Sequence, residues 1–152
     1  MAEGTRLGID WGKARIGVAA SARGTSFAFP VETVAANGSE FDRLVTLITD
    51  YEPKIVYVGL PLTLAGDQAL AADYVLEQVR RLVELMPGLA VRLIDERMST
   101  SGPSRSLTRA GRTARQQRKV IDQAAAVEIL QRALDFEASG TPAGVAFGEE
   151  EQ

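Results

Sequence analysis

An uninterrupted apolar run, Ile55–Leu60, lies in the middle of the chain. A strand without a polar face is typical of a parallel sheet that helices cover on both sides. Helical patterns of apolar residues precede and follow this run, over about residues 39–51 and 68–86. A second short strand is predicted at Ala90–Ile94, directly after the second helix. The alternation of strands and helices therefore predicts an α/β fold.

The first part of the chain has a different pattern, in which predicted strands follow one another directly. Residues 6–10 and 15–20 form a predicted hairpin around Gly12, and a third strand lies within residues 26–34. The whole chain then has the order β-β-β-α-β-α-β-α. This order predicts a five-stranded mixed sheet, in which three antiparallel strands are followed by parallel strands joined through helices.

The end of the chain divides into a helix and a tail. The last helix is predicted to run from around Thr113 or Lys119 to Ala138. Residues 139–152 have little to bury, which predicts a disordered acidic tail after a single domain over residues 1–138. No apolar run approaches the ~20 residues of a membrane helix, and no apolar signal region precedes the first strand. We therefore expect a cytoplasmic protein.

The absence of cysteine and histidine restricts the chemistry of any active site. Without these residues, a Cys/His zinc site, a cysteine nucleophile and a Ser-His-Asp triad are all excluded. An enzyme of this composition must rely on carboxylates, hydroxyl groups, lysine, arginine or a bound ion. Ligands that are all oxygen atoms favour Mg²⁺ or Mn²⁺ over softer metals.

Basic residues are concentrated in one stretch of an otherwise acidic chain. The net charge is −3, yet residues 97–121 contain seven basic side chains and no acid. Such a run is often a solvated helix face. Solvated faces usually mix both signs of charge, so we favour a surface for an anionic partner such as nucleic acid. The seven residues are Arg97, Arg105, Arg109, Arg112, Arg115, Arg118 and Lys119.

Three acids occur where the pattern predicts apolar or neutral residues. Asp10 ends the first strand, Glu96 follows the fifth strand, and Asp122 lies in an apolar part of the last helix. Each acid also has a structural explanation: Asp10 could form the turn before Gly12, and Asp122 could stabilise the helix N-terminus or pair with Arg118. None of these explanations requires the acids to converge. Converging carboxylates repel one another, but they can hold two divalent ions ~3.5–4 Å apart that activate water and stabilise a leaving oxygen.

Four segments of the chain carry a resemblance to a known family. They are Leu7–Ala19, Val58–Pro61, Asp95–Thr100 and Val120–Ala126. In order and spacing they resemble the YqgF/RuvX family, over about residues 5–138. Members of this family are described as Holliday-junction-resolvase-like proteins and as nucleases of the 16S ribosomal RNA precursor. The resemblance implies a ribonuclease H-like fold and a nuclease in which Asp10, Glu96 and Asp122 bind the metal ions.

The resemblance also bears on the residues around these acids. We do not expect Asp95 to be a ligand, because adjacent residues on a strand face opposite sides of the sheet. Thr100 is implied either to shape its loop or to touch phosphate. Lys13 and Arg15 flank the first turn and could contact phosphate, although surface charges need no such role. The chain departs from the family pattern at residues 101–104, where Ser-Gly-Pro-Ser interrupts an expected helix.

These inferences predict a metal-dependent nuclease that acts on structured nucleic acid, with Mg²⁺ or Mn²⁺ as cofactor and no membrane partner. Maturation of the 16S rRNA precursor is the preferred function, and resolution of Holliday junctions is the close alternative. A non-catalytic RNA-binding or transcription-associated factor on the same fold is a third hypothesis. An actin-like or sugar-kinase ATPase is set aside because it needs two such domains. The sequence leaves open whether the protein is a monomer or a dimer.

Overall fold

The structure is a computed structural model that describes residues 4–22, 26–60, 66–95 and 114–148, without the side chains of residues 66–69 and 114–122. A six-stranded sheet forms its centre, in the order β3-β2-β1-β4-β5-β6. The elements in chain order are β1 (Arg6–Trp11), β2 (Arg15–Ser21), β3 (Ala28–Ala35), α1 (Glu40–Tyr51), β4 (Ile55–Leu60), α2 (Gly66–Leu85), β5 (Val91–Asp95), α4 (Ala114–Ala138) and β6 (Val145–Ala146).

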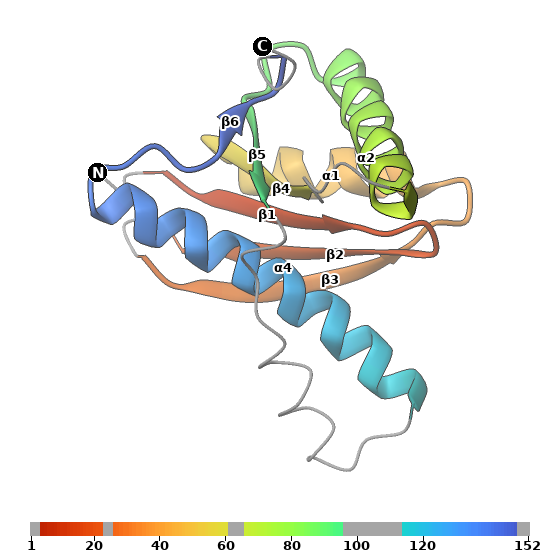
Figure 1. The fold of residues 1–152 in the computed structure, drawn as a ribbon. Helices are drawn as coiled ribbons and strands as arrows, with labels where there is room; N and C mark the ends of the chain where they lie inside the picture. Colours follow the sequence, from red (N-terminus) through yellow and green to blue (C-terminus); the bar gives the residue numbers. More distant parts are fainter. Residues whose placement is uncertain (1–3, 23–25, 61–65, 96–113, 149–152) are drawn as a thin grey trace.

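The sheet is mixed, as the order of elements predicts. β1, β2 and β3 form an antiparallel meander, whereas β4 and β5 run parallel to β1. Each parallel strand is reached through a helix, because strands that run the same way need a crossover connection. This arrangement confirms the predicted α/β fold with a ribonuclease H-like order of elements (Figure 1).

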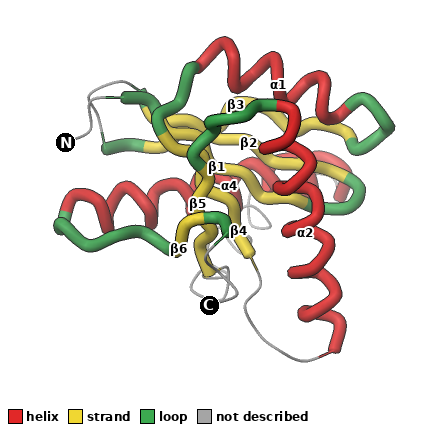
Figure 2. The backbone as a smooth tube through the Cα atoms, turned by 90° about the horizontal axis from the view of Figure 1, so that it is seen from above, coloured by secondary structure: helices red, strands yellow, loops and turns green. Residues whose placement is uncertain are grey.

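Helices cover both faces of the sheet (Figures 1 and 2). Side chains alternate along each strand, so one set of residues packs under α1 and α2 and the other under α4. On the first face, Leu7 and Ile9 of β1 belong to a core with Leu44 of α1 and Leu82 of α2. The second face has a smaller core, formed by Ala19, Tyr57 and Ile94 with Ala126, Ile129, Leu130, Ala133 and Leu134 of α4. None of the described helices is long and apolar enough to cross a membrane.

The segment after α4 differs from the expectation of a disordered tail. Residues 145–146 form β6, which pairs antiparallel with β5 and gives the sheet six strands instead of the predicted five. The Arg92 guanidinium donates hydrogen bonds to the carbonyl oxygens of Ala143 at 2.7 Å and Gly144 at 2.9 Å. The Phe147 amide donates to Val91 O at 2.9 Å. The composition of this segment did not predict a strand, because the strand depends on the open edge of β5 and on Arg92, which is about 50 residues earlier in the chain.

Candidate active site

Asp10 lies near the carboxyl end of β1, opposite Gly17 of β2, and is partly buried. Leu7 and Ile9 face α1 and α2, so the alternation of side chains places Asp10 on the face that α4 covers. The turn that follows is closed by a backbone hydrogen bond from Gly12 N to Arg15 O at 3.0 Å. The turn thus has a backbone hydrogen bond of its own, in addition to any contact that the Asp10 side chain makes.

Glycines flank Asp10 on both neighbouring strands. Gly17 is its partner on β2, and Gly59 of β4 is the next residue after Val58, the partner of Ile9. Both glycines are buried positions on the α4 face by the alternation of their strands. Neither neighbour therefore projects a side chain over the carboxylate. An acid with oxygen as its only donor, placed between two glycines, fits a hard cation such as Mg²⁺ or Mn²⁺.

Close packing brings α4 over the same part of the sheet. A Cβ added at Gly8 would lie 2.7 Å from Cβ of Leu130 and 2.9 Å from the carbonyl oxygen of Ala126. Only glycine permits this approach of the helix to β1. The preceding turn of α4 contains Asp122, so the helix carries this residue toward the face on which Asp10 lies. The Asp122 side chain itself lies outside the described residues.

The third predicted ligand, Glu96, also lies outside the described residues. β5 ends at Asp95, which pairs with Leu60 of β4. Val91 and Leu93 face α1 and α2, so alternation assigns Asp95 to that face, opposite to Asp10. Among the described side chains, no group of three acids could hold a metal ion. The joint placement of Asp10, Glu96 and Asp122 thus remains a prediction.

The predicted phosphate-binding residues are described only in part. Lys13 is exposed in the β1–β2 turn, with Nζ 5.5 Å from the centre of the Tyr74 ring of α2, a cation–π distance. Arg15 begins β2 and is partly buried. Both residues lie at the Asp10 end of the hairpin. The others lie outside the described residues or have side chains that do: Arg97, Thr100, Arg105, Arg109, Arg112, Arg115, Arg118 and Lys119.

A polar contact that the sequence analysis did not anticipate lies beside Asp122. Nε2 of Gln123 in α4 donates a hydrogen bond to Oγ1 of Thr33 in β3 at 3.0 Å. Thr33 pairs with Gly17, which in turn pairs with Asp10. The two bonded residues are 90 positions apart in the chain. The only local sequence signal is a glutamine beside Asp122, in a segment that is otherwise apolar from Val120 to Val127.

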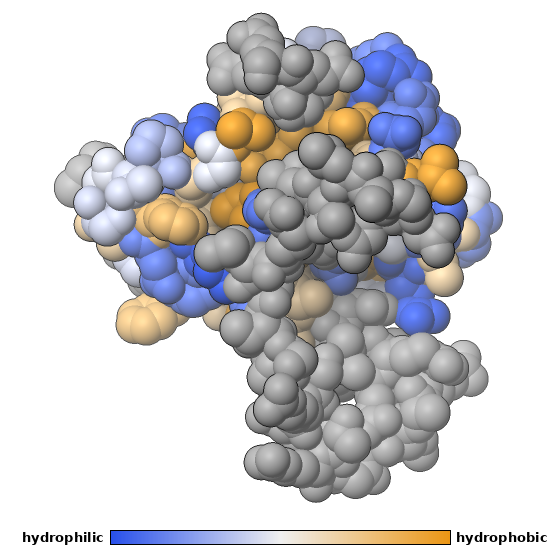
Figure 3. All heavy atoms as spheres, in the orientation of Figure 1, coloured by the Kyte–Doolittle hydropathy of each residue, from blue (hydrophilic) through white to orange (hydrophobic). Residues whose placement is uncertain are grey.

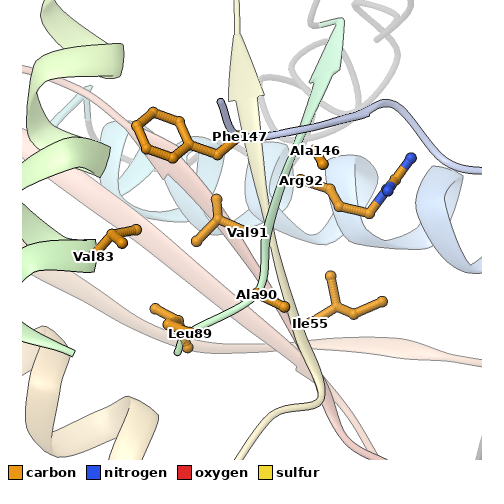
Figure 4. Close-up of a pocket in the computed structure, with 8 residues that line it drawn as sticks. All are labelled: Ile55, Val83, Leu89, Ala90, Val91, Arg92, Ala146 and Phe147. Carbon is orange, nitrogen blue, oxygen red and sulfur yellow. The ribbon is translucent and has the colours of Figure 1, made fainter. Parts of the chain in front are cut away.

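The pocket shown in Figure 4 is separate from this site. It has a volume of about 330 Å³ and lies where α2 meets the start of β5 and the β6 strand. Its walls are mostly apolar, and Arg92 is its one charged residue. Figure 3 shows apolar side chains gathered over the β5–β6 region of the surface. Because none of its lining residues lies in β1 or α4, this pocket does not belong to the Asp10 site.

Comparisons with known proteins show the family of the chain and a solved structure of similar fold. The family described as RuvX, Holliday junction resolvase, matches residues 4–136. A Cutibacterium acnes protein named "Putative pre-16S rRNA nuclease" is 52% identical over 132 residues, covering 87% of this chain and 82% of the relative. A Streptomyces coelicolor protein with the same name is 44% identical, covering 95% and 88%. The solved structure of Thermus thermophilus RuvC with a Holliday junction substrate has a TM-score of 0.59 at 18% identity, covering 92% of this chain and 98% of that one.

Proposed function

Because the chain belongs to the RuvX family, we propose that it is a metal-dependent nuclease that cuts structured nucleic acid in the maturation of the 16S rRNA precursor. The match over residues 4–136 confirms the resemblance seen in the four sequence segments. The structural observation that carries the proposal is Asp10, placed between two glycines on the face of the sheet that α4 covers. The names of the relatives support the substrate.

We propose that Asp10, Glu96 and Asp122 together hold Mg²⁺ or Mn²⁺. When bound, such ions supply an activated water and stabilise charge at the scissile phosphate. The chain's own contribution is to keep three carboxylates on one face of the sheet, where they would repel one another without a cation. The composition supports this assignment, because a chain without histidine or cysteine offers oxygen ligands for the task.

The segment from Arg97 to Lys119 is proposed to bind the phosphate backbone. Seven basic residues without an acid provide charge for phosphate oxygens, and such contacts position a substrate without reading its sequence. Thr100, Lys13 and Arg15 are further candidates for phosphate contacts. Recognition would then depend on the shape of the nucleic acid. Since the proposed substrate is ribosomal RNA, the proposed place of action is the cytoplasm.

The test of this function is a cleavage assay on two substrates with the purified protein. We expect Mn²⁺- and Mg²⁺-dependent cutting of a 16S rRNA precursor, and slower cutting of a four-way DNA junction. Faster cutting of the junction would favour a Holliday junction resolvase, the second candidate, which the description of the family supports. Tight binding of either substrate without cleavage in any metal would favour a non-catalytic binding factor and contradict the proposal.

The basic segment gives a separate prediction about binding. Replacing Arg112, Arg115 and Arg118 together with alanine should weaken binding to all substrates, because the variant neutralises fewer phosphates and so releases fewer counterions. The slope of log affinity against log salt should become shallower by ~0.7–0.9 for each phosphate that is no longer neutralised. A filter-binding titration between low and high salt measures this slope. A slope identical to that of the wild type would show that these arginines do not meet phosphate.

A further inference from the structure

Two glutamines on α4 connect this helix to the edge of the sheet formed by β3. Gln131 accepts a hydrogen bond from Ala28 N at 2.9 Å and donates one to Ser26 O at 2.7 Å. Gln123 donates to Oγ1 of Thr33 at 3.0 Å. The chain therefore has two similar connections between the same helix and the same strand region. They differ in their distance from the candidate active site.

The Gln123 connection lies at the level of Asp10. Thr33, Gly17 and Asp10 are paired across three adjacent strands, β3, β2 and β1. Adjacent strands are ~4.8 Å apart, so Thr33 and Asp10 are separated by about 10 Å across the sheet. Gln123 follows Asp122 directly in α4. The hydrogen bond thus joins the helical turn that carries one predicted ligand to the sheet row that carries another.

The hydrogen bond of Gln123 lies at the start of the part of α4 whose side chains the structure describes. Among the side chains of α4 that the structure describes, from Gln123 onward, the first buried one is Ala126 and the last is Leu134. Gln123, Ala124 and Ala125 are only partly buried. Within this described part, close packing holds α4 against β1 at Ala126 and Leu130, next to Gly8. On the side toward Asp122, the hydrogen bond to Thr33 is a polar contact that limits how far the helix can move away from the sheet.

We propose that Gln123 and Thr33 are positioning residues that hold Asp122 of α4 at the distance from Asp10 that metal binding requires. This inference rests on the proposed function of the site. Its physical reason is that carboxylates brought together repel, so a helix carrying one of them needs a restraint when no cation is bound. Groups that orient metal ligands typically change metal affinity or activity by ~10–100-fold when they are removed.

The test measures the dissociation constant for Mn²⁺ in the full-length chain, by the electron paramagnetic resonance signal of the free ion. Gln123→Ala and Thr33→Val should each raise this constant by about 10–100-fold. Thr33→Ser keeps the hydroxyl and should bind within about twofold of the wild type. Gln131→Ala is the matched control, because it removes the second glutamine connection of α4 to the β3 region and should leave Mn²⁺ affinity unchanged.

The outcomes separate this inference from the proposed function. If the wild type binds Mn²⁺ and Gln123→Ala binds equally well, the positioning role is contradicted. The same follows if Gln131→Ala weakens binding as much as Gln123→Ala, or if Thr33→Ser behaves like Thr33→Val, because a general loosening of α4 would explain such results. A folded wild type that binds no Mn²⁺, with or without nucleic acid, would instead overturn the metal site itself and the positioning role with it.

Discussion

Asp10→Asn should abolish cleavage and remove most of the stabilisation that Mn²⁺ gives to the folded protein. The amide keeps the size of the carboxylate but removes the charge that attracts a cation. We expect the variant to lose ~4 kcal/mol of transition-state stabilisation, which lies within the several kcal/mol that metal ions contribute. This loss lowers the rate of cleavage by about 10³-fold. Without metal, the variant should be at least as stable as the wild type, because a repulsion within the acid cluster is gone.

Thermal unfolding in the presence of Mn²⁺ measures this effect without knowledge of the substrate. An ion that binds the folded state stabilises it by ~2.7 kcal/mol at a hundredfold excess over its dissociation constant. For a domain of this size, each ~1 kcal/mol raises the melting temperature by roughly 2–8 °C. The titration should reach millimolar concentrations, because Mg²⁺ and its substitutes often take part of their ligands from substrate phosphates.

Asp95→Asn is the matched control for Asp10→Asn. Both acids lie near the carboxyl ends of the two strands that flank β4, but the alternation of β5 assigns Asp95 to the face of α1 and α2. The Mn²⁺-induced shift should therefore remain nearly intact in Asp95→Asn. Equal shifts in the wild type and in Asp10→Asn would mean that Asp10 is not a ligand, and would place the non-catalytic binding factor ahead.

The sequence predicted those features of the fold that local patterns determine. The apolar run Ile55–Leu60 is the whole of β4, because burial on both faces leaves a signal in every residue. Asp10 could be assigned to the end of its strand because the alternation of β1 and the turn at Gly12 are adjacent in the chain. The resemblance to a family then supplied what the residues alone left open, namely which acids are expected to act together.

Contacts between distant residues could not be read from the sequence. The strand β6 has only two residues, and it forms because β5 offers an open edge beside Arg92. The hydrogen bond between Gln123 and Thr33 joins polar residues that each look ordinary in their own segments. Such pairs have no periodicity, so only the assembled fold reveals them.

Glu137→Ala should cost about 3 kcal/mol of the free energy of unfolding, a large part of the ~5–15 kcal/mol that stabilises a typical domain. The Glu137 carboxylate lies near the C-terminal end of α4, 3.1 Å from the guanidinium of Arg6, whose side chain is only 5% exposed. It also accepts a hydrogen bond from the hydroxyl of Tyr57, which is almost fully buried. Burial, and then this hydrogen bond, raises the pKa of Tyr57 well above its ordinary value, so the phenol remains a neutral donor.

The large effect is expected because alanine removes the Glu137 carboxylate and leaves the side chains of Arg6 and Tyr57 buried. Arg6 would keep its 2.7 Å hydrogen bond to the carbonyl oxygen of Gly4 but would lose the Glu137 carboxylate 3.1 Å away, in a buried position where such a loss is costly. Glu137→Gln retains the volume and one acceptor, so it should cost about 1.5–3 kcal/mol, the range of a hydrogen bond to a charged group, and less than Glu137→Ala. Glu84→Ala, which removes an exposed ion pair with Arg80, should change stability little.

Urea unfolding of the three variants at neutral pH distinguishes a buried anchor from an ordinary surface ion pair. If Glu137→Ala is as mild as Glu84→Ala, Arg6 must regain its solvation by moving out of the interior, and α4 does not depend on this anchor. If the predicted order holds, α4 is fixed near its C-terminal end by charge and in its centre by the Gly8 contact. Both restraints lie on the C-terminal side of the helical turn that carries Asp122. The hydrogen bond of Gln123 lies directly beside Asp122, so of the three contacts it would act closest to the proposed metal site.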